Sequence, residues 1–276
     1  MRSYRHVGAA AILLAALGAM PALADDDHGG PQPNDNLPVY LDRTVDATAQ
    51  DTCTPGFLWQ GAGNPATTFQ RKRNLDAGIE LAIKAIIRQG ADIRSTYVDG
   101  DGLVHIEVPS GAQPGNPNRA AWNFTYSYDV ALDASNPTLD NYDAELWIDL
   151  DPSDRTDYLK LKLTKLGPPA PPAACPREPD ANGYGWKAGN TVVIPDDEGT
   201  DHVTQNSQNL AFYTTLIDND PHQKGIQPYT FGAGQFDVVM TIKRKNARNR
   251  HHDDDGNDGT TLHVVFDVVD APTQTP

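Results

Sequence analysis

The carboxylates of one short segment could bind a hard cation. The segment WIDLDPSDRTDY contains Asp149, Asp151, Asp154 and Asp157. Asp149 and Asp151 share a face if a strand runs through them, and Pro152 enforces a turn at Asp154, so these carboxylates could converge on Ca²⁺. The structural alternative is a capped Asp-Pro-Ser turn with solvated aspartates, because this tripeptide is common turn chemistry. Both interpretations stay open, and Ca²⁺ is the cofactor that the first one requires.

A second group of metal-binding residue types lies in the segment HHDDDGNDG. His251 and His252, with the neighbouring aspartates, could hold Zn²⁺, Cu²⁺ or Ni²⁺, since imidazole suits these ions. A calcium-binding EF-hand loop is excluded, because it needs Glu at its twelfth position, and counting from Asp253 or from Asp254 reaches a valine there. The alternative is an enlarged hairpin tip over residues 246–259, since Gly, Asn and Asp are usual in such turns.

Trp147 is a candidate for stacking on a sugar ring. It alternates with Leu146, Ile148 and Leu150, so it faces away from their apolar row, unless a loop covers it and makes it part of the core. The sequence contains no G-x-S-x-G elbow, no H-E-x-x-H and no G-x-x-x-x-G-K-[ST] phosphate loop. We therefore predict no catalytic residues and a protein that is not an enzyme.

The amino terminus has the pattern of a secretory signal peptide. Arg2 and Arg5 precede a short apolar run, and Ala22 and Ala24 form a small-x-small cleavage site. We expect residues 1–24 to be removed, with no membrane insertion of the mature chain. A secreted or periplasmic location follows from this pattern.

Two cysteines occur in the whole sequence, Cys53 and Cys175. An even number of cysteines in an exported protein predicts a disulfide, and each lies in a turn-rich segment that a crosslink would hold. The alternative is a pair of unlinked thiols. Neither cysteine belongs to a C-x-x-C motif, so redox catalysis and a zinc knuckle are not expected.

The chain is acidic, with a formal net charge of -15 over 276 residues. Nucleic acid and anionic membrane surfaces are poor partners for such a chain, because both would be repelled. Residues 25–38 form an acidic arm with almost nothing to bury, and we expect this arm to be disordered.

Most of the remaining sequence alternates apolar and polar residues as strands do. The segments that carry this pattern are VYLD, IRSTYV, LVHIEV, AWNFTYSYDVAL, AELWIDLD, YLKLKL, LAFYTTLI, FDVVMTIKRK and TLHVVFDVV. Residues 78–90 fit either a helix or a strand, and we favour a strand. Residues 167–190 are rich in Pro and Gly and predict a long surface loop.

These strands predict an all-β fold. Short strands joined by turns describe an antiparallel β-sandwich, jelly-roll-like or immunoglobulin-like, with long Pro/Gly-rich loops. We expect a single domain over residues 39–270 and a tail over residues 271–276.

Several segments together resemble a group of exported proteobacterial proteins. The segments are GIELAIKAIIR, AAWNFTYSYDVALDASNPTLDNYDAELWIDLDPS, VTQNSQNLAFYTTL and FDVVMTIKRK. Many proteins of this group end in a sorting tail with a Pro-Glu-Pro signature. This chain ends in DAPTQTP without one, which favours a released or periplasmic protein. The resemblance implies export and a β-rich fold, and it brings no catalytic residues.

Two functions are compatible with the sequence. The first is a secreted, non-enzymatic β-sandwich that interacts with polysaccharide or other components of the cell envelope or extracellular matrix. The second is a Ca²⁺-dependent carbohydrate-binding module or glycan-active enzyme, centred on Trp147 and on the aspartates from Asp149 to Asp157.

Overall fold

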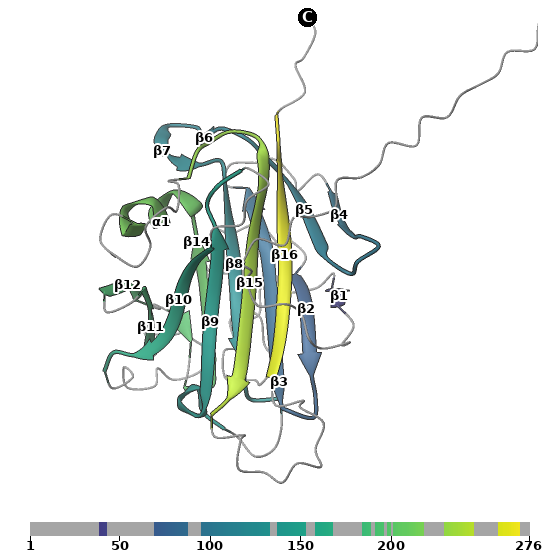
Figure 1. Cartoon of the computed structure of the whole chain (residues 1–276), viewed down its shortest axis with the longest axis vertical. Helices are drawn as coiled ribbons and strands as arrows, with labels where there is room; N and C mark the ends of the chain where they lie inside the picture. Colours follow the sequence, from purple (N-terminus) through teal and green to yellow (C-terminus); the bar gives the residue numbers. More distant parts are fainter. Residues whose placement is uncertain are drawn as a thin grey trace, which may run out of the picture.

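The computed structural model describes eleven stretches of the chain: residues 39–42, 69–87, 95–132, 137–152, 158–167, 184–188, 191–195, 198–199, 201–217, 229–245 and 259–270. Within these stretches the fold is all-β with two large sheets, as predicted (Figure 1). Cys53, Cys175, Asp154, Asp157, His251 and His252 lie outside the described residues.

One sheet has six strands. Their order is β1 (Val39–Asp42), β2 (Phe69–Asn74), β3 (Ile79–Ile87), β8 (Trp122–Asp129), β14 (Val203–Gln208) and β13 (Glu198–Gly199). Every neighbouring pair in this sheet is antiparallel. All residues of β3 and β8 are buried, so both faces of the sheet are covered at its centre.

The other sheet has eight strands. Their order is β12 (Thr191–Pro195), β11 (Tyr184–Ala188), β10 (Tyr158–Lys165), β9 (Tyr142–Asp149), β15 (Gly234–Arg244), β16 (Gly259–Val269), β5 (Val104–Pro109) and β4 (Ser95–Val98). All pairs are antiparallel except β16 with β5, which run parallel. A separate two-stranded ribbon joins β6 (Ala112–Gln113) and β7 (Asn116–Ala120).

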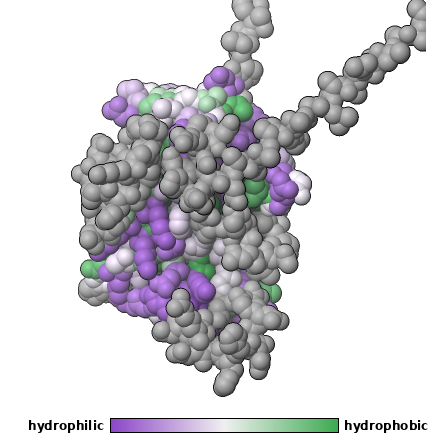
Figure 2. Space-filling view, in the orientation of Figure 1, coloured by the Kyte–Doolittle hydropathy of each residue, from purple (hydrophilic) through white to green (hydrophobic). Residues whose placement is uncertain are grey.

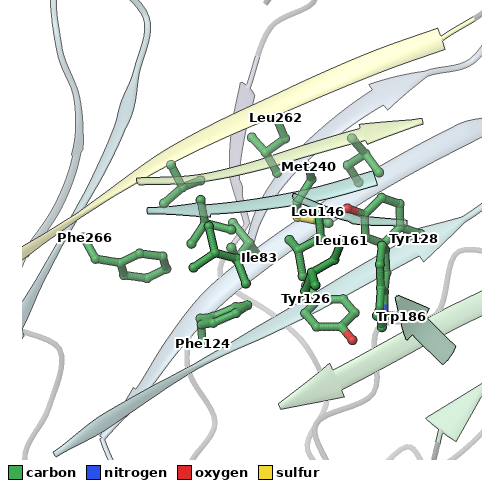
Figure 3. Close-up of a cluster of buried hydrophobic side chains, with 14 of the residues drawn as sticks. Ile83, Phe124, Tyr126, Tyr128, Leu146, Leu161, Trp186, Met240, Leu262 and Phe266 are labelled. Carbon is green, nitrogen blue, oxygen red and sulfur yellow. The ribbon is translucent and has the colours of Figure 1, made fainter. Parts of the chain in front are cut away.

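The core lies between the two large sheets. Figure 3 shows side chains of β3 and β8 meeting those of the eight-stranded sheet, such as Leu146, Met240 and Leu262. The alternating aromatic side chains of β8 face this core: the ring centroid of Trp122 lies 4.7 Å from that of Phe266 on the opposite sheet. Burying one apolar face of each sheet is what stabilises a sandwich.

Two predictions about secondary structure are wrong. The segment LAFYTTLI forms the helix α1 (Leu210–Ile217) instead of a strand. The predicted loop over residues 167–190 contains β11, whose Trp186 is buried and packs edge-on against Tyr126 at 5.6 Å between centroids. The preference for a strand in residues 78–90 is confirmed by β3, and its alternation is blurred because both of its faces are buried.

The side chain of Asn209 joins β14 and α1 to the neighbouring strands. Its Oδ1 accepts hydrogen bonds from the backbone N–H of Ala120 at 2.9 Å and of Ala211 at 3.2 Å. Its Nδ2 lies 3.0 Å from Ala120 O, 2.9 Å from Trp122 O and 2.7 Å from Asn123 Oδ1. Because Asn209 immediately precedes α1, the bond from Ala211 is also the N-cap of the helix.

Polar side chains are buried on the face of the six-stranded sheet that points away from the core. Lys84 is 0% exposed, and its Nζ lies 4.6 Å from the ring centroid of Phe69. This burial lowers the pKa of the Lys84 amine to about 7. Glu80, on the same face, forms an ion pair with Arg73 and lies 3.3 Å from Arg71 Nη1.

Candidate functional site

The outer face of the eight-stranded sheet carries charged and aromatic side chains of the types that can bind a polar ligand. Strand registers pair Tyr158 with Asp149 and join Asp237, Val265, His105 and Tyr97 in that order. The adjacent pair of Ile148 with Val238 aligns these two sets as one row across six strands. With neighbouring strands about 4.8 Å apart, the row spans roughly 24 Å. Figure 2 shows hydrophilic side chains over β9 and β10 on this face and, at the right-hand edge, over the β4–β5 hairpin.

Trp147 lies at the β9–β10 end of this face, pointing away from the core as its alternation predicts. The Nζ of Lys160 lies 4.3 Å from the centroid of the Trp147 ring. Tyr158 meets the same ring edge-on at 6.1 Å, and Trp147 Nε1 donates a hydrogen bond to Glu145 Oε2 at 3.2 Å. A sugar stacking on Trp147 would therefore compete with an ammonium group already over the ring.

Asp149 holds the turn that follows β9. Its Oδ1 accepts a hydrogen bond from the Asp151 N–H at 3.0 Å, and its side chain is buried. In the part of the chain that the structure describes, no group of three His, Cys, Asp or Glu side chains is placed to hold a metal ion. Since Asp154 and Asp157 lie outside that part, the Ca²⁺ site at Asp149 and Asp151 stays a prediction. The metal site at His251 and His252 also stays a prediction, because both residues lie outside the described part of the chain.

The turn after Asp149 packs against the first residue of β15. A Cβ on Gly234 would lie 2.3 Å from Pro152 Cβ and 2.8 Å from Pro152 O. We expect Gly234→Ala to lower the free energy of unfolding by about 1–3 kcal/mol, because the added methyl group must displace backbone. Urea denaturation measures this loss. Gly232→Ala is the control, since its nearest neighbour would be Thr230 Oγ1 at 3.8 Å, and equal losses in both variants would contradict the packing argument.

An exposed aromatic ring lies at the other end of the row, on the edge strand β4. The Tyr97 side chain is 48% exposed. Its ring nevertheless stacks on the ring of its cross-strand partner His105, with centroids 4.8 Å apart and planes 7° apart. The phenol oxygen lies 3.4 Å from Asp267 Oδ2. One face of the ring is thus supported, and the ring is held in a fixed orientation.

Two carboxylates hold the supporting imidazole. Nδ1 of His105 lies 2.9 Å from Asp267 Oδ2, and Nε2 lies 3.2 Å from Asp99 Oδ2. Although burial opposes the change, hydrogen bonds from the Leu103 N–H, from His105 and from the Asp101 N–H lower the pKa of Asp99. Because a carboxylate occupies each ring nitrogen, neither nitrogen is free to exchange a proton with a substrate. This geometry serves binding better than acid–base catalysis.

Further polar side chains bond to Asp267 and to a third nearby carboxylate, that of Glu107. Gln235 Nε2 donates to Asp267 Oδ1 at 2.9 Å, and Ser95 Oγ donates to Glu107 Oε2 at 3.1 Å. We call Tyr97, His105, Asp99 and Asp267 the Tyr97 platform. It presents a rigid aromatic surface with carboxylate oxygens at its border, which is the chemistry that binds sugar rings and cations.

The Tyr97 platform was not among the site residues predicted from the sequence. The alternation in IRSTYV and LVHIEV does place Tyr97 and His105 on one face of a hairpin, and that signal was present. Asp267 follows His105 by 162 residues in the chain. The parallel pairing of β5 with β16 brings the two residues together, and no local pattern in the sequence predicts that pairing.

Comparison of the chain with protein families, with curated proteins and with solved structures finds no match. Among the described residues, no helix is both long and apolar enough to cross a membrane.

Proposed function

We propose that this protein is a secreted or periplasmic, non-enzymatic β-sandwich that binds polysaccharide of the cell envelope or extracellular matrix. The binding surface is the outer face of the eight-stranded sheet, and the Tyr97 platform is its principal contact. The signal-peptide pattern of residues 1–24 supports the location.

The observation that carries the proposal is the exposed ring of Tyr97. A tyrosine exposed to 48% usually samples several rotamers, yet this ring lies flat on His105. An aromatic surface already held in place loses little conformational entropy when a ligand stacks on it. Oxygen acceptors of Asp99 and Asp267 at its border can accept hydrogen bonds from sugar hydroxyl groups.

The proposal predicts that purified protein is retained by polysaccharide and that Tyr97→Ala weakens this retention. We expect a loss of about tenfold in affinity, the usual effect of removing an aromatic contact at the centre of a site. Sedimentation with insoluble polysaccharides and calorimetry with soluble fragments measure it. Phe212→Ala is the matched control, because Phe212 is also exposed, to 39%, but lies on α1.

Two results would contradict the proposal. Retention that is equal in the wild type, in Tyr97→Ala and in Phe212→Ala would remove the platform from the binding surface. Release of reducing sugar from a bound polysaccharide by the purified protein would show that it is an enzyme.

A further inference from the structure

Negative charge surrounds the exposed ring of Tyr97. Asp99, Glu107 and Asp267 come from the β4–β5 turn, from β5 and from β16. Residues 95–109 and 259–269, which form these elements, contain no Lys or Arg. Partial burial and the charges of Asp267, Asp99 and Glu107 all raise the pKa of the Tyr97 phenol, as a negative local potential requires. In the part of the chain that the structure describes, these three carboxylates outnumber the one basic side chain beside them, that of His105, so the local charge is negative.

Several other aromatic rings of the protein have one of its own cations over them. Lys160 lies over Trp147 at 4.3 Å and Arg119 over Phe212 at 5.0 Å. The same contact joins Lys84 to Phe69, Lys165 to Tyr184 and Arg244 to Tyr142. Among the described residues, no Lys or Arg of the protein lies over Tyr97. Within the described residues, the ring therefore has His105 on one face and carboxylates at its border, and its 48% exposure leaves room for a cation.

We propose that the Tyr97 platform selects sugars that carry a protonated amino group, as in polymers of glucosamine, over neutral or acidic sugars. This inference rests on the proposed polysaccharide binding and names the class of polysaccharide. The ammonium group lies over the exposed face of Tyr97, where the ring quadrupole attracts it, and Asp99 and Asp267 supply the opposite charge. The sugar ring that carries it packs against the rest of the aromatic surface.

Amino sugars fit this site better than the other glycan classes. Acidic polysaccharides would meet three carboxylates and a chain of net charge -15, so they are repelled. Neutral sugars would stack on the ring but would leave the surrounding negative charge without a partner. A glucosamine unit satisfies both features, because its ring is apolar on one side and its amine is positive.

The test compares two oligosaccharides that differ only in the amino group. Titration calorimetry of the full chain uses β-1,4-linked glucosamine oligomers and their fully N-acetylated counterparts of the same length, at mildly acidic pH. We expect the free amine to bind at least about tenfold more tightly, and to weaken as salt is added. Tyr97→Ala should weaken the binding of both oligomers by about tenfold, whereas Tyr97→Phe keeps the ring and should retain the preference.

Asp267→Asn and Asp99→Asn remove charge while keeping hydrogen-bond acceptors beside His105. Each is expected to reduce the preference for the free amine by about threefold to tenfold, with smaller effects on the acetylated oligomer. Melting curves of each variant confirm that it is folded. If an aspartate variant does not fold, the inference is still tested by whether Tyr97→Phe retains the preference for the free amine.

The outcomes separate the two proposals. Equal affinity for the two oligomers would overturn the amino-sugar inference and leave polysaccharide binding in place. Failure to bind any oligomer or polysaccharide would overturn both. Binding of polylysine as tight as that of the glucosamine oligomer, and unaffected by Tyr97→Ala, would show only general attraction to an acidic surface and would also overturn the inference.

Discussion

Asn209→Ala is expected to lower the free energy of unfolding by roughly 3–5 kcal/mol, because it leaves several buried backbone groups without their partner. The side chain is 1% exposed and bonds to both the N–H and the C=O of Ala120 and to the C=O of Trp122. It also caps α1 through the Ala211 N–H. Chemical denaturation of the variant and the wild type measures the loss.

Asn206→Ala is the matched control for this prediction. Asn206 is the same residue type and lies three residues earlier, on β14, but its side chain is only partly buried and accepts a hydrogen bond from the N–H of its neighbour Ser207 at 2.7 Å. We expect a change below about 1 kcal/mol there. Equal losses at both positions would show that Asn209 does not have the connecting role that its contacts indicate.

Lys84→Met is expected to remove a pH dependence of stability. The amine has a pKa of about 7 in the folded protein and an ordinary value of 10.5. Between these values the unfolded chain binds a proton that the folded protein does not, so the wild type gains stability as pH rises. The gain approaches about 1.4 kcal/mol per pH unit in that window. Below the folded pKa both states are protonated, and the contribution no longer changes.

Urea denaturation at several pH values between about 7.5 and 9.5 measures this slope. Over that window we expect the free energy of unfolding of the wild type to rise by roughly 2 kcal/mol more than that of Lys84→Met. Lys84→Arg is a second test, since arginine stays charged throughout the window and also lacks the slope. It should be less stable than the wild type, most clearly at high pH. Equal slopes in the wild type and in Lys84→Met would contradict the prediction.

The strands that alternate clearly were predictable from the sequence, and those whose burial depends on partners were not. Residues of β9, β15 and β16 alternate because only one face of each meets the apolar core. The strand β2 reads FQRKRN and has no apolar row. It is a strand because Arg71 and Arg73 pair with the buried Glu80 of β3, a contact that no local pattern encodes.

The helix α1 shows tertiary contacts deciding the structure of a short segment. LAFYTTLI contains aromatic and β-branched residues that favour strands, and its alternation supports that interpretation. The helix forms because Asn209 caps its first turn and because Tyr213 is buried, with its ring 6.2 Å from that of Phe124. Neither contact can be read from the segment alone.

The candidate site was predicted in part. The outward direction of Trp147 and the turn after Asp149 follow from alternation and from turn chemistry, both of which are local. The Tyr97 platform combines a hairpin that the sequence predicts with Asp267 and Gln235, which only the order of strands in the sheet brings near it. Exposure and stacking decide its role, and both are properties of the folded sheet.

The parallel pairing of β5 with β16 also fixes when during biosynthesis the platform can exist. A ribosome completes Tyr97 and His105 long before Asp267, which follows His105 by 162 residues. A nascent chain that has only the β4–β5 hairpin lacks the carboxylate that orients both rings and the strand on which the hairpin lies. Closing such a distant contact is slow, so the complete Tyr97 platform exists only in the finished protein and is absent from its translation intermediates.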